Sequence, residues 1–265
     1  MFSKVLLPVE LNESLNDIKL RASFVVKLGA QDIILLHVLT PGLGGTGHAE
    51  SRLRHFQEVL HEVGVTSHYH VEEGNVPGEI TNVARDHEVD LIYIPASGKN
   101  FLLTSLVGST TQDVIRLANR PVWVHKQRPF LKHKESMDKM IFATDFKHAA
   151  ERCCFPVKEL SRLIPELIVL HVGERAADPY SEQIRKEEVD NNLDKMSEYF
   201  RDSFTRVRAI ARIGSPAKQI LNVVEQEQVD LVVLGRINEP FPLNFLGSTC
   251  GRVTSGASSS VLLVP

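Results

Sequence analysis

Short apolar runs and longer mixed stretches alternate along the whole chain. The runs are continuous and rich in β-branched residues. This pattern is typical of strands in a parallel sheet that has helices on both faces. Strands are predicted over residues 4–9, 32–38, 65–71, 90–94 and 121–125, and again over 139–144, 166–172, 205–211, 230–234 and 260–264.

The stretches between the first five runs have helical periodicity. In the first of them Leu15, Ile18 and Ala22 share one face, and Gly29 ends the helix. Helices are predicted over residues 14–28, 49–63, 77–87 and 109–118, and the second half repeats this order. Five parallel strands joined by helices make a doubly wound α/β sheet in each half, with right-handed connections.

The two halves also match residue by residue. Blocks of similar sequence are displaced by 134 to 140 residues, as in the runs 33–38 and 167–172. The chain is therefore predicted to be a tandem duplication. We place domain 1 at residues 1–126, a polar, proline-bearing linker at 127–138 and domain 2 at 139–265.

Composition fits a soluble globular protein without a strong electrostatic partner. The chain has 265 residues, of which 43% are hydrophobic and 24% charged, and a net charge of -3. These values give no bias toward nucleic acid or a membrane surface. There is no apolar run near the roughly 20 residues of a membrane span, and the first residues lack signal-peptide character, so a cytoplasmic location is expected.

Cysteine and histidine give weaker signals. Cys153, Cys154 and Cys250 form neither a disulfide framework nor a zinc pattern, so buried or idle thiols are expected. His68 and His70 alternate on one strand face, and His55 and His61 lie on the preceding helix. A surface zinc site is conceivable there, but solvated histidines are the favoured interpretation and no metal is required. His37 and His171 end the second strand of each half, where they either line a pocket or cap a neighbouring carbonyl.

Ligand chemistry is expected at the carboxyl ends of the strands, where the winding of such sheets reverses. Two features of each half fall there. The first strand ends in an acid, Glu10 or Asp145, and the loop after the fourth strand ends in Gly-Ser-Thr, at 108–110 and 247–249. A glycine before a helix lets backbone N–H groups approach a phosphate. Serine is also a preferred helix N-cap, so the triplets alone also suit an ordinary helix start.

Together these residues resemble the universal stress protein domain in its tandem form. The resemblance rests on the acid after strand one, the His-Val of strand two, the Val-Asp-Leu that begins strand four at residues 89–91 and 229–231, and the apolar closing strand. It implies an adenine nucleotide alpha hydrolase-like fold. Nucleotide-binding members carry Gly, two residues, Gly, nine residues and then Gly-Ser or Gly-Thr after strand four, with the strand-one Asp beside the nucleoside.

The second half is closer to this pattern and is the preferred site. Gly235 and Asp145 are present, whereas Asn238 replaces the second glycine and eight residues separate it from Gly247. Asn tolerates the left-handed backbone better than most residues. The resemblance implies a nucleotide site made of Thr144, Asp145, Val172, Leu234, Gly235, Asn238, Gly247, Ser248 and Thr249.

The first half departs further from the pattern. Pro95 replaces the opening glycine, which removes an N–H and adds bulk, and the acid is the longer Glu10. The corresponding, less favoured site consists of Glu10, Val38, Gly98, Gly108, Ser109 and Thr110. A Gly-x-Gly-x-x-Gly run at 42–47 follows the second strand instead of the first, so a flexible loop is expected there and not a dinucleotide fingerprint.

The leading hypothesis is a cytoplasmic stress-response protein that binds ATP or a related adenine nucleotide in a regulatory role, with at most weak ATP hydrolysis. A scaffold of the same fold that binds no nucleotide, and a slow nucleotide hydrolase or transferase, are the alternatives. The closing strands at 121–125 and 260–264 are expected to pair within the chain and so cover two sheet edges. A homodimer is possible, and association of two chains is left open.

Overall fold

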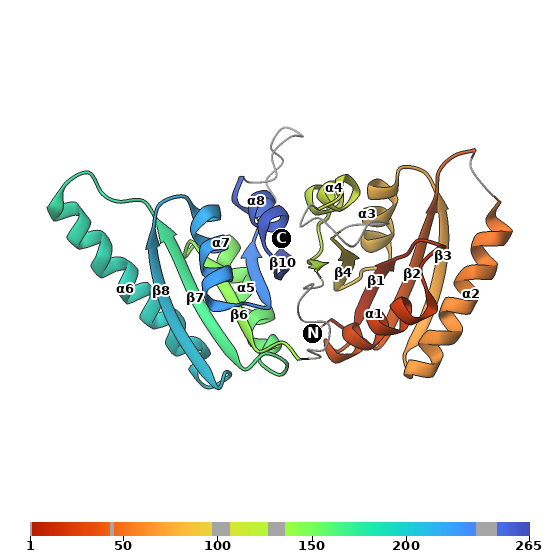
Figure 1. The fold of residues 1–265 in the computed structure, drawn as a ribbon, viewed down its shortest axis with the longest axis horizontal. Helices are drawn as coiled ribbons and strands as arrows, with labels where there is room; N and C mark the ends of the chain where they lie inside the picture. The colour runs from red at the N-terminus through yellow and green to blue at the C-terminus, as the bar shows by residue number, and fades with distance from the viewer. Residues whose placement is uncertain (1, 43–44, 97–106, 127–135, 237–247) are drawn as a thin grey trace. The chain divides into compact units, whose positions relative to one another are not determined.

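In the computed structural model, the described residues are 2–42, 45–96, 107–126, 136–236 and 248–265. They form two compact units (Figure 1). The first unit contains the described residues up to 96 and residues 108–123, and the second contains Val107 and the described residues from 124 onward. Each unit is an α/β sheet with helices on its faces, as the sequence predicts.

Strands and helices alternate in both units. The first half contains β1 (Lys4–Pro8), α1 (Leu15–Lys27), β2 (Asp32–Leu39), α2 (Thr46–Val63), β3 (Thr66–Glu73), α3 (Val76–Asp86), β4 (Leu91–Pro95), α4 (Ser109–Leu117) and β5 (Val122–His125). The second half contains β6 (Lys139–Thr144), α5 (His148–Leu160), β7 (Glu166–Gly173), α6 (Pro179–Arg201), β8 (Arg206–Ile213), α7 (Pro216–Glu227), β9 (Leu231–Gly235), α8 (Ser248–Gly256) and β10 (Ser260–Val264).

The strand order is the same in both units. It runs β3-β2-β1-β4-β5 in the first and β8-β7-β6-β9-β10 in the second. In each unit the second and third strands therefore lie on one side of the first strand, and the fourth and fifth strands lie on its other side. The direction of winding reverses between β1 and β4 and between β6 and β9, and both of these pairs are parallel. A crevice at the carboxyl ends of these pairs is the place where ligands bind in such sheets.

Five elements are longer than predicted, namely β2, β3, β7, β8 and α2. Strands β3 and β8 continue to Glu73 and Ile213, because each pairs along the full length of its neighbour. Helix α2 begins at Thr46 after an extended Gly45, so Gly47 lies in its first turn. A Cβ at Gly47 would meet nothing within 4 Å, whereas the third glycine of a dinucleotide fingerprint is needed for close packing.

An aspartate ties the first and fourth strands together in each unit. The Asp90 carboxylate accepts hydrogen bonds from the Ser3 hydroxyl at 2.7 Å and the Lys4 backbone N–H at 2.9 Å. In the second unit the Asp230 carboxylate accepts from the backbone N–H groups of Asp138 at 2.8 Å and Lys139 at 3.1 Å. The aspartate of each Val-Asp-Leu sequence thus has a structural role at the amino end of the sheet.

The pairing of the closing strands β5 and β10 with one another stays a prediction. A cytoplasmic location also stays an expectation. Among the helices of the described residues, none is both long and apolar enough to cross a membrane.

Replacing Asp230 with Ala is expected to lower the free energy of unfolding by about 2 kcal/mol, because two backbone N–H groups lose a charged acceptor. Urea unfolding measures the effect. Asp194→Ala, at an exposed position of α6, is the control and should change the free energy by about 0.5 kcal/mol or less. Equal effects of the two substitutions would show that the Asp230 contacts do not stabilise the sheet.

Candidate functional site

Four of the predicted residues of the second unit lie at the ends of β6 and β9, where the winding reverses. Thr144 ends β6 and is buried, and Asp145 follows it with an exposed side chain. Leu234 and Gly235 end β9, and Ala143 of β6 pairs with Leu234. Val172 is half-buried near the end of β7. The backbone of Ser248 starts α8, where Thr249 is half-buried, while Asn238 and Gly247 lie outside the described residues.

Local hydrogen bonds fix the backbone around Asp145. The Thr144 hydroxyl accepts from the N–H of Phe146 at 2.9 Å, and the Asp145 carboxylate accepts from the N–H of Lys147 at 3.0 Å. Phe146 has a φ of 59°, in the left-handed region that a bulky residue rarely adopts. Such backbone strain persists only where surrounding contacts hold it in place. Here these contacts fix the direction in which the Asp145 side chain leaves the strand.

A histidine caps the carbonyl before the acid in both units. The Nδ1 atom of His171 lies 2.9 Å from the carbonyl oxygen of Thr144, and Nδ1 of His37 lies 2.9 Å from that of Val9. The carbonyl cap that the sequence left as one of two alternatives is therefore present. The His171 ring also stacks on Phe146, with the ring centroids 4.5 Å apart and the planes at 18°. No sequence signal marked Phe146 for this place.

Gly235 is required by packing. A Cβ added to it would overlap the backbone carbonyl of Ala149 and lie 3.0 Å from the N–H nitrogen of Ala150, both in the first turn of α5. Helix α5 thus approaches the end of β9 more closely than any side chain would allow. The glycine that the resemblance assigns to nucleotide binding has this structural function as well.

Arg236, which follows Gly235, is buried. The residue is 7% exposed, and its backbone N–H donates to the carbonyl of Val264 at 2.7 Å. Arg152 of α5 donates to the backbone carbonyls of Pro265 at 2.7 Å and Arg236 at 3.3 Å. These contacts join the carboxyl ends of β9 and β10 to α5, and no pattern in the sequence indicates them.

In the first unit, arginines hold the segment that follows β1. Arg21 contacts the Glu13 carboxylate at 2.5 Å and donates to the carbonyl of Pro8 at 2.8 Å. Arg52 donates to the carbonyls of Leu11 at 3.0 Å and Glu13 at 2.7 Å. The Glu10 side chain is exposed, and its backbone N–H donates to Glu13 at 2.7 Å. The segment between β1 and α1 is thus held in place by the ion pair of Glu13 with Arg21 and by the hydrogen bonds from Arg52.

The start of α4 is also tied back to β4. The N–H of Gly108 donates to the carbonyl of Ala96 at 2.9 Å, and the Thr111 hydroxyl donates to that of Pro95 at 3.2 Å. Ser109 and Thr110 are exposed, Val38 is half-buried in β2, and Gly98 lies outside the described residues. In the second unit Cys250 stands in place of Thr111, and its thiol lies 3.7 Å from the carbonyl oxygen of Gly235. A thiol is a weaker donor than a hydroxyl.

The cysteines are free thiols, with Cys153 and Cys250 buried and Cys154 half-buried. Burial raises the pKa of Cys250 to about 11, against a smaller opposite effect of Arg236, and it also raises the pKa of Cys153. Low thiolate content makes such groups poor nucleophiles. His55 and His61 are exposed on α2. Within the described ranges, His, Cys, Asp and Glu side chains form no group of three or more that could hold a metal ion.

The chain belongs to the universal stress protein family, whose family model matches residues 1–126 and 137–265. A universal stress protein of Methanocaldococcus jannaschii is 26% identical over 157 residues, which cover 48% of this chain and 97% of that protein. The crystal structure of a universal stress protein from Archaeoglobus fulgidus has the same fold, with a TM-score of 0.70 and 19% identity over 98% of this chain and 95% of that one. A universal stress protein solved in complex with cAMP matches 49% of this chain and 98% of that one, with 16% identity and a TM-score of 0.39.

Gly235→Ala is expected to lower the free energy of unfolding by about 1–3 kcal/mol, because the new methyl group forces α5 away from β9. Gly108→Ala is the matched control. Its Cβ would lie 4.0 Å from the Ala96 carbonyl oxygen. At this N-cap the substitution should lower the free energy of unfolding by less than about 1 kcal/mol. Thermal unfolding followed by circular dichroism compares them, and equal stability of the two variants would contradict the packing role of Gly235.

Proposed function

We propose that the protein binds ATP or a related adenine nucleotide at the second unit, as a regulatory module of the stress response. Family membership supports this class of function. Asp145 leaves β6 with an exposed carboxylate on a fixed backbone, beside the end of β9. Glu10 is exposed as well, so the choice of the second unit is supported by strand four, where Gly235 stands in place of Pro95. An exposed carboxylate at this edge of the sheet suits the hydroxyl groups of a ribose, which donate hydrogen bonds to it.

The first unit offers less to a nucleotide. Its N–H at Gly108 and its hydroxyl at Thr111 already donate to the end of β4. Pro95 has no N–H to offer, and the Glu13 carboxylate is engaged by Arg21. A phosphate arriving at the amino end of α4 would compete with these internal bonds. The nucleotide site proposed for the second unit therefore has a weaker counterpart in the first.

The amino end of α8 would bind the phosphates. Backbone N–H groups in the first turn of a helix attract anions, and α8 begins at Ser248 with Thr249 and Cys250 in its first turn. Gly247, Ser248 and Thr249 are proposed for this role, with Asn238 in the preceding loop. Val172 and Leu234, at the ends of the strands on either side of β6, are proposed to contact the base or the ribose.

Asp145→Ala is expected to weaken ATP binding by about tenfold or more, because a charge-assisted hydrogen bond contributes about 1.5–3 kcal/mol. Glu10→Ala, the equivalent substitution in the first unit, should leave the affinity unchanged. Isothermal titration calorimetry on the full chain measures both. Absence of affinity in the wild type at millimolar ATP would favour the interaction scaffold, and steady phosphate release abolished by Asp145→Ala would favour a hydrolase.

A further inference from the structure

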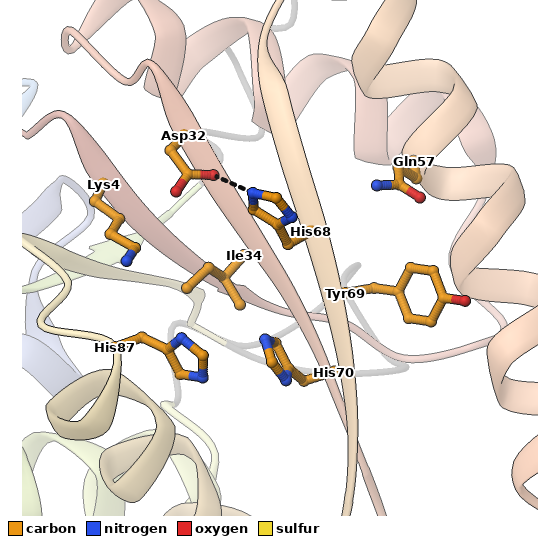
Figure 2. Close-up of a pocket in the computed structure, with 8 residues that line it drawn as sticks. All are labelled: Lys4, Asp32, Ile34, Gln57, His68, Tyr69, His70 and His87. Carbon is orange, nitrogen blue, oxygen red and sulfur yellow. Dashed lines mark ion pairs between the residues drawn. The ribbon is translucent and has the colours of Figure 1, made fainter.

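A polar hollow lies at the opposite end of the sheet in the first unit. It has a volume of about 490 Å³ (Figure 2). Lys4 and Asp32, the first residues of β1 and β2, contribute to it. Its lining is completed by Ile34, Gln57, His68, Tyr69, His70 and His87. The hollow is distinct from the reversal point between β1 and β4, which lies at the carboxyl ends of the strands.

The duplication supplies an internal comparison for this hollow. Lys4 pairs with Asp32 in the sheet register as Lys139 pairs with Glu166. His68 lies opposite Ile34 as Arg208 lies opposite Ile168. His87 and Glu227 each lie three residues before the aspartate that ties strand four to strand one. The equivalent residues of the two units are therefore Lys4 and Lys139, Asp32 and Glu166, His68 and Arg208, and His87 and Glu227.

In the second unit this location contains its own anion. The Glu227 carboxylate accepts from both terminal nitrogens of Arg208, at 2.5 and 3.3 Å, and lies 3.4 Å from Nζ of Lys139. The hydrogen bond from Arg208 is the largest cause that lowers the pKa of Glu227. Lys139 and Arg206 also approach Glu166, at 4.0 and 3.8 Å. Two carboxylates, of Glu166 and Glu227, are thus paired with three cationic side chains there.

In the first unit the carboxylate is replaced by an imidazole. His87 contacts His70, with the ring centroids 4.4 Å apart, and Nε2 of His68 lies 3.7 Å from Asp32. Figure 2 shows the rings of His70 and His87 next to each other, while the Tyr69 side chain points away from them. Lys4 keeps the position of Lys139. The lining therefore keeps one lysine and has histidine in place of Arg208 and threonine in place of Arg206. Asp32 remains at the position of Glu166, but the carboxylate of Glu227 has no counterpart there.

We propose that this hollow binds a small oxyanion, the chemistry that phosphate and carboxylate ligands share, through Lys4, His68 and His87. The anion takes the place that the Glu227 carboxylate occupies in the second unit. Lys4 donates through its ammonium group and the imidazoles through their N–H groups. Asp32 remains paired with His68 and orients its ring.

Binding should strengthen as the pH falls, because an anion favours the charged imidazolium. Burial lowers the pKa of His70. The neighbouring His87 and His68 lower the pKa of His70 further, whereas Glu72 raises it. The titratable or charged groups that face the site are Lys4 on β1, Asp32 on β2, His68, His70 and Glu72 on β3, and His87 at the end of α3. If one proton is taken up together with the anion, binding weakens by up to about tenfold for each unit by which the pH rises.

The test is an NMR titration of the full chain with inorganic phosphate and, separately, with acetate, which follows the histidine ring resonances near pH about 6. We expect shifts at His68, His70 and His87, but not at His61 on the exposed face of α2, and weaker binding at higher pH. A response to phosphate alone identifies a phosphate ligand, and a response to acetate alone identifies a carboxylate ligand. No shift with either anion at millimolar concentration overturns the proposal, as does a response to Zn²⁺ alone.

His87→Glu restores the carboxylate of the second unit and should weaken anion binding at least about tenfold, because it supplies an internal competitor. His87→Gln keeps a neutral donor and should retain part of the affinity. His61→Gln is the control on α2, and Asp145→Ala should leave the response unchanged because it alters only the proposed nucleotide site. Unaltered phosphate binding in folded His87→Glu, checked by circular dichroism, would overturn the assignment.

Discussion

The bond between an aspartate at the start of strand four and the backbone at the start of strand one is the constraint on which each unit depends. Asp90 and Asp230 hold neighbouring strands that are far apart in the chain. A carboxylate that accepts backbone N–H groups there fixes which strands adjoin at the point where the winding reverses. At the other end of the first strand, His37 and His171 hold the carbonyl before the acid. Strand one of each unit is thus fixed at both ends, so that the residue after it has a defined position.

The same frame accommodates different side chains at its carboxyl end. In the second unit a glycine lets α5 approach β9, and the acid leaves the strand beside a strained phenylalanine. In the first unit Pro95 stands at the glycine position, and Arg21 and Arg52 close the segment after β1. The close approach of α5 and the loss of a backbone donor at Pro95 both follow from one residue of strand four. The residue at this position, Pro95 or Gly235, therefore makes the two units differ both in how the helix packs on strand four and in the backbone donors available there.

Apolar runs and their repetition were sufficient to predict the sheet, because a buried parallel strand has a strong signal of its own. The acid Asp145 and the carbonyl-capping histidines were found in the same way, as residues at strand ends. Phe146, Arg152 and the burial of Arg236 could not be found, since each depends on contacts between elements distant in sequence. His68 and His70 were considered with the histidines of the preceding helix, yet the ring that contacts His70 is that of His87. Strand alternation directs Tyr69 and the two histidines to opposite faces, and the sequence does not show which helix covers each face.

The two units differ at both ends of the sheet, and the differences run in opposite senses. At the carboxyl end the acids Glu10 and Asp145 are both exposed, but the first unit also holds the segment after β1 with the ion pair of Glu13 and Arg21. At the amino end the second unit joins Glu227 to Arg208 and Lys139, while the first presents histidines around a hollow. A polar group withdrawn from water needs a partner, which is either another side chain or a ligand. Ion pairs thus hold the carboxyl-end segment after β1 in the first unit and the amino end of the sheet in the second, and the two ligand sites that we propose lie at the opposite ends.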